Sequence, residues 1–490
     1  MTFTRRAQFA TISALFCVLA AFYVFAWSLP AVGLNPDDGA FFVTARSIAG
    51  GHGYAIESLP HPIAQTNFPP LFPFVLALFT RVSMQTQWLK LLPLLCCAGW
   101  LLLTRRLLLK MGASQNAAWV LIALTAASPT VVYLSTNLLP ETLFALLATA
   151  ALLALLEERA VLAGVLAGLS TLTRTGGIAL IITCILTLVA RRRFRGAAAF
   201  AGIAMLIAAP WFGWSLAHLS HDAAQAPREI FTGLAASEKL VVISRNFVSL
   251  LASPLSLLAG FNTVYFVFAT LVLLVRSIWV RRQLVPDLFV AFYSLFLLFW
   301  ISPPEISVAP ILPLFFWIVW RAFRLMGNRE ALAALILIIL GTPLAADAVR
   351  ILPSHADGVF AREGPPADNW YRMRDVFQLI RKNTPSDAVL LANPDTAFYL
   401  NTGRKTVRGF APNYFDLFYL RQQSSVSPDQ LSRTIALERV GWVVITPDRG
   451  LPESPSFHLS VDALLRGGVI DPVITPGLPR DYRLFRVLKY

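Results

Sequence analysis

Charged side chains are scarce in this 490-residue sequence. Asp, Glu, Lys and Arg together make up only 14% of it, against about 25% in a typical globular protein. A soluble protein of this size would need more charge to cover its surface. Hydrophobic residues make up 56% of the sequence, whereas a disordered chain has low hydrophobicity. The composition therefore excludes both classes and predicts a multi-pass membrane protein with room for one further soluble domain.

Several familiar motifs are also missing. The four cysteines, Cys17, Cys96, Cys97 and Cys184, all lie within apolar stretches, which excludes a disulfide framework and a cysteine-based metal motif. The sequence contains no P-loop, dinucleotide fingerprint or internal repeat. Because it also contains no nucleotide-sugar motif, we do not expect a soluble nucleotide as a donor.

Positive charge is in excess, with a formal net charge of +14. A basic chain can indicate a nucleic-acid partner. Here most basic residues flank apolar runs, where they act as signals for membrane topology. We therefore expect no nucleic-acid partner.

Apolar runs of about 17–25 residues can each cross a hydrocarbon core of roughly 30 Å as a helix. The first run, residues 7–29, is longer than a signal-peptide core and lacks a cleavage site, so we expect a membrane anchor. The pair 160–173 and 175–190 is short and predicts two thin spans or one re-entrant hairpin. The runs after the first are 86–108, 115–135, 138–156, 160–173, 175–190, 197–217, 255–275, 285–301, 308–325 and 331–350. Together they predict an all-α polytopic membrane domain of about eleven transmembrane helices.

The apolar stretch 68–79, F-P-P-L-F-P-F-V-L-A-L-F, decides the predicted topology. As a helix it would extend only about 18 Å, so we expect an interfacial or re-entrant segment. With a cytoplasmic N-terminus, the basic clusters then fall inside, as the positive-inside rule requires. These clusters are Arg105, Arg106 and Lys110; Arg191, Arg192, Arg193 and Arg195; Arg276, Arg281 and Arg282; and Arg321, Arg324 and Arg329.

This topology divides the chain into a transmembrane domain, residues 1–350, and an extracytoplasmic domain, residues 351–490. The transmembrane domain has a first outside loop at 30–85 and a second at 218–254. Charge, Pro, Asp and Asn all increase after residue 351, which predicts a soluble α/β domain. Within it, 370–383 has helical periodicity, and the apolar runs 389–392 and 442–446 predict short buried strands.

Two adjacent carboxylates, Asp37 and Asp38, begin the first outside loop. One interpretation is structural, because a carboxylate at the start of a helix over 39–49 stabilises the helix N-terminus. The other is catalytic, because a base at the membrane interface could deprotonate an acceptor hydroxyl, with a divalent metal ion as a candidate cofactor nearby.

Glu141 and Arg174 are ionisable residues next to apolar runs. Glu141 follows Pro140 and could stabilise a helix start, but an ionisable group at membrane depth is also a candidate functional residue. Arg174 lies on the predicted outer side, against the charge bias, and therefore needs an anionic partner. That partner could be Glu141, an Asp of the first loop or a lipid phosphate.

His218 and His221 have i, i+3 spacing next to Asp222, which could hold a metal ion on a helical turn. The alternative is that two polar residues simply end a span. His52 and His61 of the first loop could contact a substrate, although no motif surrounds them.

The order of these features resembles the GT-C glycosyltransferases, in the branch of bacterial relatives of protein O-mannosyltransferases and lipid A aminoarabinose transferases. The first loop carries the acidic pair, a predicted helix ending A-R-S-I-A-G-G-H-G-Y, and N-F-P-P-L-F-P. An acid then follows a span, an arginine stands in L-T-R-T-G-G, and A-F-Y-L-N-T-G-R ends at Arg404. The matching positions are Asp37 and Asp38; Gly51, Gly53 and Tyr54; Pro69, Pro70 and Pro73; Glu141; and Arg174 with Gly177.

The resemblance implies that a sugar is transferred with inversion from a polyprenyl-phosphate donor to a lipid, glycan or protein acceptor. The reaction would take place on the outer face of the bacterial cytoplasmic (inner) membrane. Asp37 would be the base or a metal neighbour, and Asp38 stands where Glu is more usual. The residues expected to bind substrates are Arg174, Glu141, Arg46, His52 and Tyr54.

Two positions depart from the pattern of these glycosyltransferases. Asn67 stands where a Lys often precedes the Pro-Pro pair, and P-E-I-S-V-A-P-I-L-P, with Glu305, lacks the usual Arg-Tyr. Both changes remove positive charge near the expected donor phosphate.

Two other functions stay open: a transporter or flippase for a lipid-linked or hydrophobic solute, and a non-catalytic scaffold with this fold. A transporter is less consistent with the large first loop, the soluble tail and the lack of a repeat.

Overall fold

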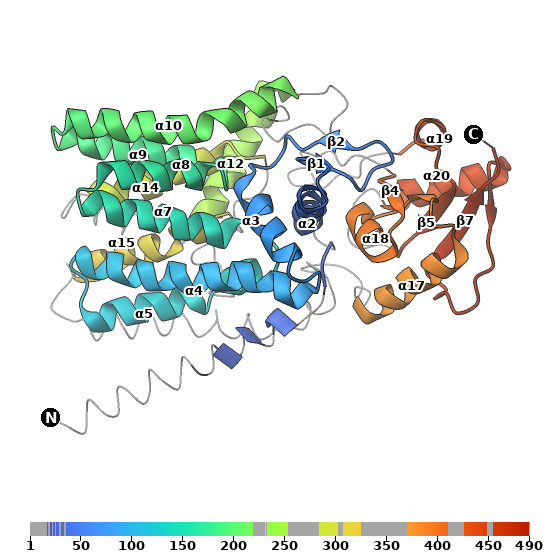
Figure 1. Ribbon diagram of the computed structural model, residues 1–490, viewed down its shortest axis with the longest axis horizontal. Coiled ribbons are helices and arrows are strands. Elements are labelled where there is room, and N and C mark those ends of the chain that lie inside the picture. The colour runs from blue at the N-terminus through green and yellow to red at the C-terminus, as the bar shows by residue number, and fades with distance from the viewer. Residues whose placement is uncertain are drawn as a thin grey trace.

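The computed structural model describes residues 17, 20–21, 23–24, 26–28, 31–33, 36–218, 231, 233–252, 284–301, 307–324, 370–409, 426–447 and 454–489. A helical domain and a smaller sheet-containing domain lie side by side, and the first loop lies between them (Figure 1). The predicted combination of an α-helical domain with a C-terminal α/β domain is therefore confirmed.

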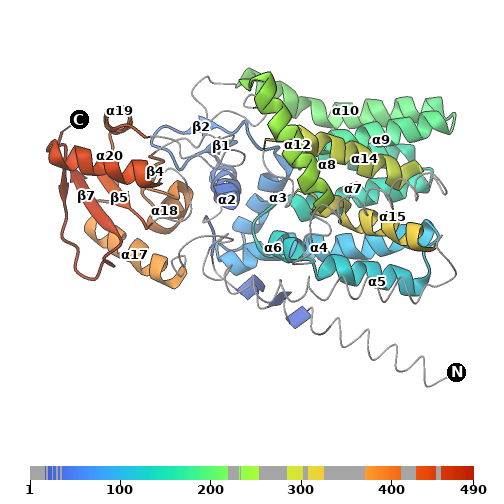
Figure 2. The ribbon, with the colours of Figure 1, turned by 180° about the vertical axis from the view of Figure 1, so that it is seen from behind.

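The helical domain is a bundle in which α7 packs against both α4 and α8, and α8 packs against α10. Seen from behind, α12 crosses the bundle near α14 (Figure 2). Its elements are α4 (Thr86–Lys110), α5 (Gln115–Ala126), α6 (Pro129–Thr136), α7 (Glu141–Leu156), α8 (Ala160–Thr171), α9 (Gly177–Ala190), α10 (Phe194–Ala217), α12 (Ala236–Ala252), α14 (Leu284–Leu298), η1 (Ala309–Ile311) and α15 (Leu312–Arg324).

Two helices of the described residues, α4 and α10, are long and apolar enough to cross a membrane. The α5–α6 pair, bent by 67°, would make a third if it formed one span. The bend falls where Pro129 begins α6, because proline has no N–H to continue the hydrogen bonds of α5. Shorter apolar helices make up the rest of the described part of this membrane domain.

The predicted count of eleven spans is not confirmed. The runs 255–275 and 331–350, and most of 7–29, lie outside the described residues. The short pair is two separate helices, α8 with 12 residues and α9 with 14. The predicted second loop, 218–254, contains the helix α12.

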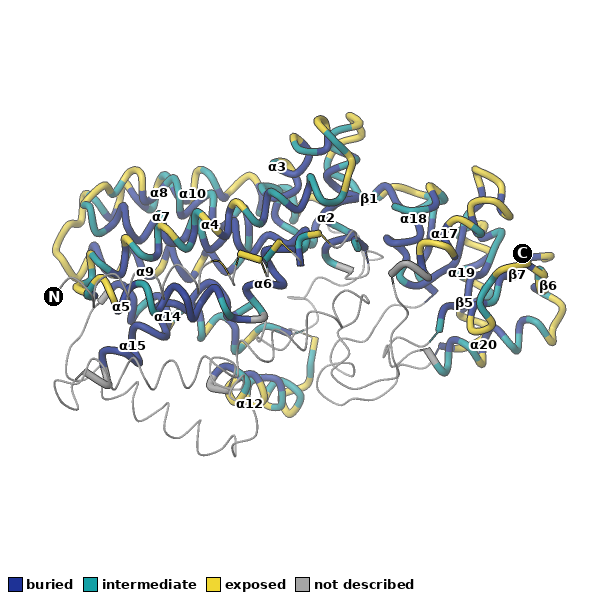
Figure 3. Tube along the Cα trace, turned by 90° about the horizontal axis from the view of Figure 1, so that it is seen from below, coloured by how far each residue is buried: buried dark blue, intermediate teal, exposed yellow. Residues whose placement is uncertain are grey.

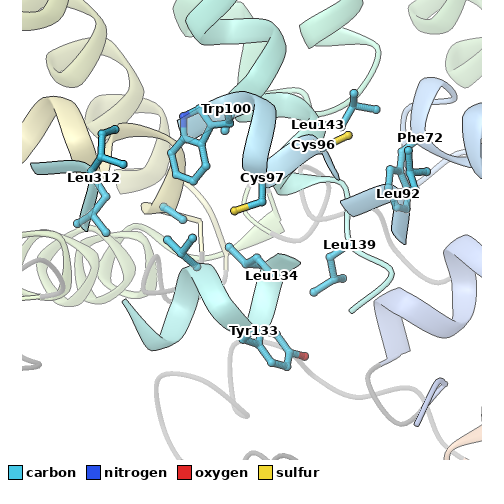
Figure 4. Close-up of a cluster of buried hydrophobic side chains, with 14 of the residues drawn as sticks. Phe72, Leu92, Cys96, Cys97, Trp100, Tyr133, Leu134, Leu139, Leu143 and Leu312 are labelled. Atoms are coloured by element: carbon cyan, nitrogen blue, oxygen red, sulfur yellow. The ribbon is translucent and has the colours of Figure 1, made fainter. Parts of the chain in front are cut away.

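Buried side chains fill the interior of both domains (Figure 3). In the helical domain, Trp100 and the buried cysteines of α4 pack against side chains of α6 and α7, such as Leu134 and Leu143 (Figure 4). The cysteines that were predicted to lie in apolar surroundings are unpaired. Cys96, Cys97 and Cys184 are buried, and Cys17 is exposed.

The first loop folds into α2 (Pro36–Ala49), a hairpin of β1 (Ala55–Ile56) and β2 (Ile63–Ala64), and α3 (Leu71–Thr80). Helix α3 has only 10 residues, as expected for a segment too short to span. Its first residue is tied to the bundle, because the Leu71 N–H donates to the carbonyl of Leu172 at 2.9 Å. This bond fastens the Pro-Pro stretch to the turn that carries Arg174.

The C-terminal domain, which we expect to be soluble and call the soluble domain, has a five-stranded sheet in the order β4-β3-β5-β7-β6. Strand β3 pairs in parallel with β4 and β5, while β7 pairs antiparallel with β5 and β6. The elements are α17 (Trp370–Asn383), β3 (Val389–Leu391), α18 (Asp395–Thr402), β4 (Lys405–Val407), α19 (Pro428–Leu437), β5 (Trp442–Ile445), α20 (Ser454–Arg466), β6 (Ile470–Pro472) and β7 (Arg483–Val487). The predicted helix 370–383 and the strands at 389–392 and 442–446 are confirmed.

Helices cover both faces of this sheet. Leu391 and Val443 pack with residues of α19 and α20, whereas their neighbours Leu390 and Val444 pack with residues of α17 and α18. This alternation follows from strand geometry, in which successive side chains point to opposite faces. The soluble domain therefore has three layers and two small cores.

Candidate active site

The two adjacent carboxylates of the first loop lie in different surroundings. Helix α2 begins at Pro36, earlier than the predicted 39, so both acids lie in its first turn. Asp38 is buried, and its Oδ1 accepts a hydrogen bond from the Gly33 N–H at 2.9 Å. It also interacts electrostatically with Lys90, which is buried in α4. Burial raises the pKa of Asp38 to about 7, and its contacts join α2 to the preceding turn and to the bundle.

Asp37 is half-buried and interacts electrostatically with two arginines, Arg174 and Arg408. Burial raises the pKa of Asp37, and the two positive charges oppose this rise. A carboxylate base works best when its pKa lies near the operating pH, so the direction of the shift suits a general base. The structure thus separates the acidic pair: Asp38 faces Gly33 and Lys90, and Asp37 faces the arginines.

Arg174 pairs with Glu141. Arg174 lies in the turn between α8 and α9, and Glu141 is the first residue of α7, where the helix dipole favours an acid. The Arg174 Nη2 donates to Glu141 Oε1, with side-chain exposures of 22% and 4%. Asp37 interacts electrostatically with both residues. Three predicted site residues from distant parts of the sequence therefore converge.

A glycine allows this turn to lie close to α14. A Cβ at Gly176 would come within 2.8 Å of the Tyr293 ring. Tyr293 in turn donates its hydroxyl hydrogen to the carbonyl of Ser307 at 3.0 Å and interacts electrostatically with Arg174. The T-G-G segment thus positions the arginine against an aromatic residue that the sequence analysis did not single out.

The soluble domain also contributes to this site. Arg408 follows β4, and its Nε and Nη2 both donate to Asp395 Oδ1, at 3.0 and 2.8 Å. Asp395 begins α18. Arg408 also interacts electrostatically with Asp37, so positive charges of both domains act on the carboxylate of α2.

Close packing between α18 and the start of α2 brings the two domains together. A Cβ at Gly39 would lie 2.2 Å from Thr396 Oγ1, and one at Gly33 would lie 2.9 Å from the Ala397 Cα. The Thr396 hydroxyl donates to the Gly33 carbonyl at 3.4 Å. A Cβ at position 39 would therefore require Thr396 or the start of α2 to shift, beside Asp37.

Arg46 and His52, both predicted to bind substrate, lie at a second contact between the domains. Arg46 stacks over the ring of Tyr399, 5.3 Å from its centroid. The His52 Nδ1 lies 3.0 Å from Glu57 Oε2, and Glu57 Oε1 accepts a hydrogen bond from the Tyr399 hydroxyl at 3.1 Å. Lys405 also donates to the carbonyl of Glu57. These contacts give Arg46 and Glu57 a role in domain docking, and His52 contacts Glu57. Substrate binding by Arg46 and His52 stays a prediction.

Tyr54 belongs to an aromatic cluster where the first loop meets α10. Its hydroxyl donates to the Phe68 carbonyl at 2.6 Å, and its ring contacts Phe74, Trp211 and Trp214. Burial raises the pKa of Tyr54. The Trp214 indole N–H donates to the Gln65 carbonyl at 3.1 Å, so this cluster fixes the loop on the bundle.

The predicted metal site at His218 and His221 gains no support. The ring of exposed His218 stacks on Trp214 with centroids 3.8 Å apart, and His221 lies outside the described residues. Within the described ranges, no group of three or more His, Cys, Asp or Glu side chains could hold a metal ion. The neighbours of Asp37 that we identify are arginines and Glu141, and we assign no metal to it.

The fold, a helical domain joined through its first loop to an α/β domain, is similar to that of solved GT-C glycosyltransferases, as the sequence predicted. The particular likeness is to ArnT from Cupriavidus metallidurans, a lipid A aminoarabinose transferase. Its crystal structure bound to undecaprenyl phosphate matches with a TM-score of 0.60 at 12% identity, covering 97% of this chain and 98% of that chain. The apo structure matches with a TM-score of 0.55 at 13% identity, covering 98% of each chain. No family model and no curated protein matches the sequence.

Sequence reasoning missed Lys90, Tyr293, Asp395 and Arg408. Lys90 could have been noticed as a charged residue within an apolar run, for which an opposite charge nearby is expected. Asp395 and Arg408 flank the segment A-F-Y-L-N-T-G-R that carried the family resemblance. Glu305, which departs from the family pattern, lies outside the described residues.

Proposed function

We propose that this protein is a membrane glycosyltransferase that moves a sugar from a polyprenyl-phosphate donor to a lipid, glycan or protein acceptor. The reaction would take place on the outer face of the bacterial cytoplasmic membrane, with inversion at the anomeric carbon. The observation that carries this proposal is the position of Asp37, a half-buried carboxylate next to the Arg174–Glu141 pair. The fold likeness to an ArnT structure bound to undecaprenyl phosphate supports the donor class.

The proposed chemistry needs one base and a positive charge. Asp37 takes the proton from the acceptor hydroxyl, whose oxygen attacks the anomeric carbon of the donor sugar. The bond from that carbon to the phosphate oxygen breaks, and its electron pair leaves with the lipid phosphate. Arg174 faces the charge that develops on this leaving group, which a preorganised guanidinium stabilises.

The substitution Asp37→Asn tests this function. In liposomes that contain the full chain, a panel of undecaprenyl-phosphate sugars and a membrane-lipid extract as acceptor, we expect the wild type to release undecaprenyl phosphate. Asp37→Asn should abolish the release with folding intact, because Asn serves nearly as well as Asp at a helix start but cannot act as a base. Asp429→Asn is a matched control, because Asp429 is an exposed acid in the first turn of α19.

The alternative functions predict different results in the same liposomes. A transporter or flippase would move the lipid-linked sugar between leaflets without breaking the sugar–phosphate bond. In that case neither the wild type nor Asp37→Asn would release undecaprenyl phosphate. A non-catalytic scaffold would do neither. Wild-type release of undecaprenyl phosphate that persists at a normal rate in Asp37→Asn would remove Asp37 as the base.

A further inference from the structure

The soluble domain brings one ion pair directly to the start of α2. Thr396, next to Asp395, packs on Gly39 and bonds to Gly33, so the N-terminal end of α18 lies beside Asp37 and Asp38. Asp395 holds the Arg408 guanidinium through two nitrogens, which fixes its orientation. The position of Arg408 relative to Asp37 therefore depends on the docking of one domain on the other.

Arg408 and Arg174 belong to different domains, and both interact electrostatically with the Asp37 carboxylate. Each arginine has its own acidic partner, Asp395 or Glu141, and each also interacts with Asp37. The guanidinium of Arg408 remains accessible, with 30% of the side chain exposed. Two arginines that are each oriented by a carboxylate, and that both act on the same position, are suited to binding an anion.

We propose that Arg408 binds the phosphate of the lipid-linked donor, together with Arg174, so that the soluble domain completes the active site. This inference rests on the proposed function. Arg408 stays protonated throughout and exchanges no proton; it stabilises the phosphate oxygens as the sugar–phosphate bond breaks. An arginine suits this task because its planar fork binds phosphate through two parallel hydrogen bonds.

Binding of undecaprenyl phosphate to the full chain in nanodiscs tests the proposal. Arg408→Gln should weaken binding about 10-fold or more, the effect of losing a hydrogen bond to a charged group. Arg408→Lys should bind less tightly than wild type but more tightly than Arg408→Gln. Arg433→Gln is the control, because Arg433 is an exposed arginine of α19 in the same domain and its loss should leave binding unchanged.

Two further ligands separate a lipid phosphate from other sources of binding. Undecaprenol lacks the phosphate, so it should bind more weakly than undecaprenyl phosphate. Its affinity should be the same for the wild type and for all variants. Inorganic phosphate lacks the lipid, so it should compete only poorly with undecaprenyl phosphate. Equal competition by inorganic phosphate would indicate a general anion site and overturn the assignment to the donor.

The outcomes distinguish this inference from the proposed function. If Arg174→Gln loses undecaprenyl phosphate while Arg408→Gln binds it like the wild type, the role of Arg408 is wrong and the proposed function stands. If the wild type binds undecaprenol as tightly as undecaprenyl phosphate, the donor class itself is wrong. If Arg408→Gln fails to fold, Arg408→Lys decides the matter, because wild-type affinity in that variant overturns the proposal.

Discussion

Arg174 and Glu141 form an ion pair at one end of the helical bundle, where the α8–α9 turn meets the start of α7. The sequence left open whether Arg174 pairs with a carboxylate or binds a phosphate. The ion pair is compatible with both roles. A guanidinium that is already oriented by a carboxylate can bind a phosphate with less loss of side-chain freedom. The buried Glu141 Oε2 makes no hydrogen bond within the described residues, so Arg174 is the partner that holds the Glu141 carboxylate.

Arg174 and Glu141 can be tested together by a double-mutant cycle. If Arg174 binds the donor phosphate, Arg174→Ala should reduce donor use strongly, Arg174→Lys should reduce it less, and Glu141→Ala should not restore activity to Arg174→Ala. If Arg174 only balances Glu141, the double variant removes both charges together and should recover substantially. The measurement is the rate of undecaprenyl phosphate release at several donor concentrations. Recovery of the double variant to near wild-type donor use would remove Arg174 from the active site.

Asp38 should matter for stability more than Asp37. Asp38→Asn can still accept the Gly33 hydrogen bond, but it removes the negative charge that interacts with buried Lys90. Removing one charge of an interacting buried pair leaves the other charge without compensation, which destabilises the fold. We expect a clear drop in the thermal unfolding temperature of Asp38→Asn, a small change in Asp37→Asn, and partial recovery in Asp38→Asn/Lys90→Met. Equal unfolding temperatures for the two single variants would contradict this division of roles.

Gly39 should control the docking of the soluble domain. Gly39→Ala favours the helix by about 1 kcal/mol from propensity alone, yet its Cβ would collide with Thr396. We therefore expect lower transfer activity and less disulfide formation between Ser58→Cys and Thr406→Cys, because the Thr406 N–H bonds to the Ser58 carbonyl at 2.9 Å. Gly202→Ala in α10 is the control, because a Cβ there meets nothing within 4 Å. Normal cross-linking in Gly39→Ala would show that the interface tolerates the methyl group.

The predicted orientation can be checked by cysteine labelling in a chain that lacks its four native cysteines. Arg193→Cys and Arg433→Cys place the label at exposed positions of the helical and soluble domains. Arg404 of the same domain is less suitable for labelling, because its side chain donates to the carbonyls of Arg381 and Thr384. The positive-inside rule predicts labelling of position 433 from outside and of position 193 from inside. The reverse pattern would invert the topology.

The sequence alone determined the features that depend on short stretches of chain. Low charge and long apolar runs indicated a membrane protein, and the composition change near residue 351 indicated a soluble domain. Helix α17 and strands β3 and β5 follow from their periodicity, and α7 begins at Glu141 because Pro140 suits a helix start. Each of these features is governed by interactions between residues that are neighbours in the sequence.

Only the tertiary structure decided which residues share the candidate site. Adjacent Asp37 and Asp38 look equivalent in the sequence, and they differ because the packing of α2 turns one toward Lys90 and the other toward Arg174 and Arg408. Arg408 has no local signature, since its importance comes from a close approach between Gly39 and Thr396 in another domain. Electrostatic interactions depend on distance in space rather than separation along the chain. The docking of the two domains therefore decides which charged residues share the candidate site, and a local sequence pattern does not contain this information.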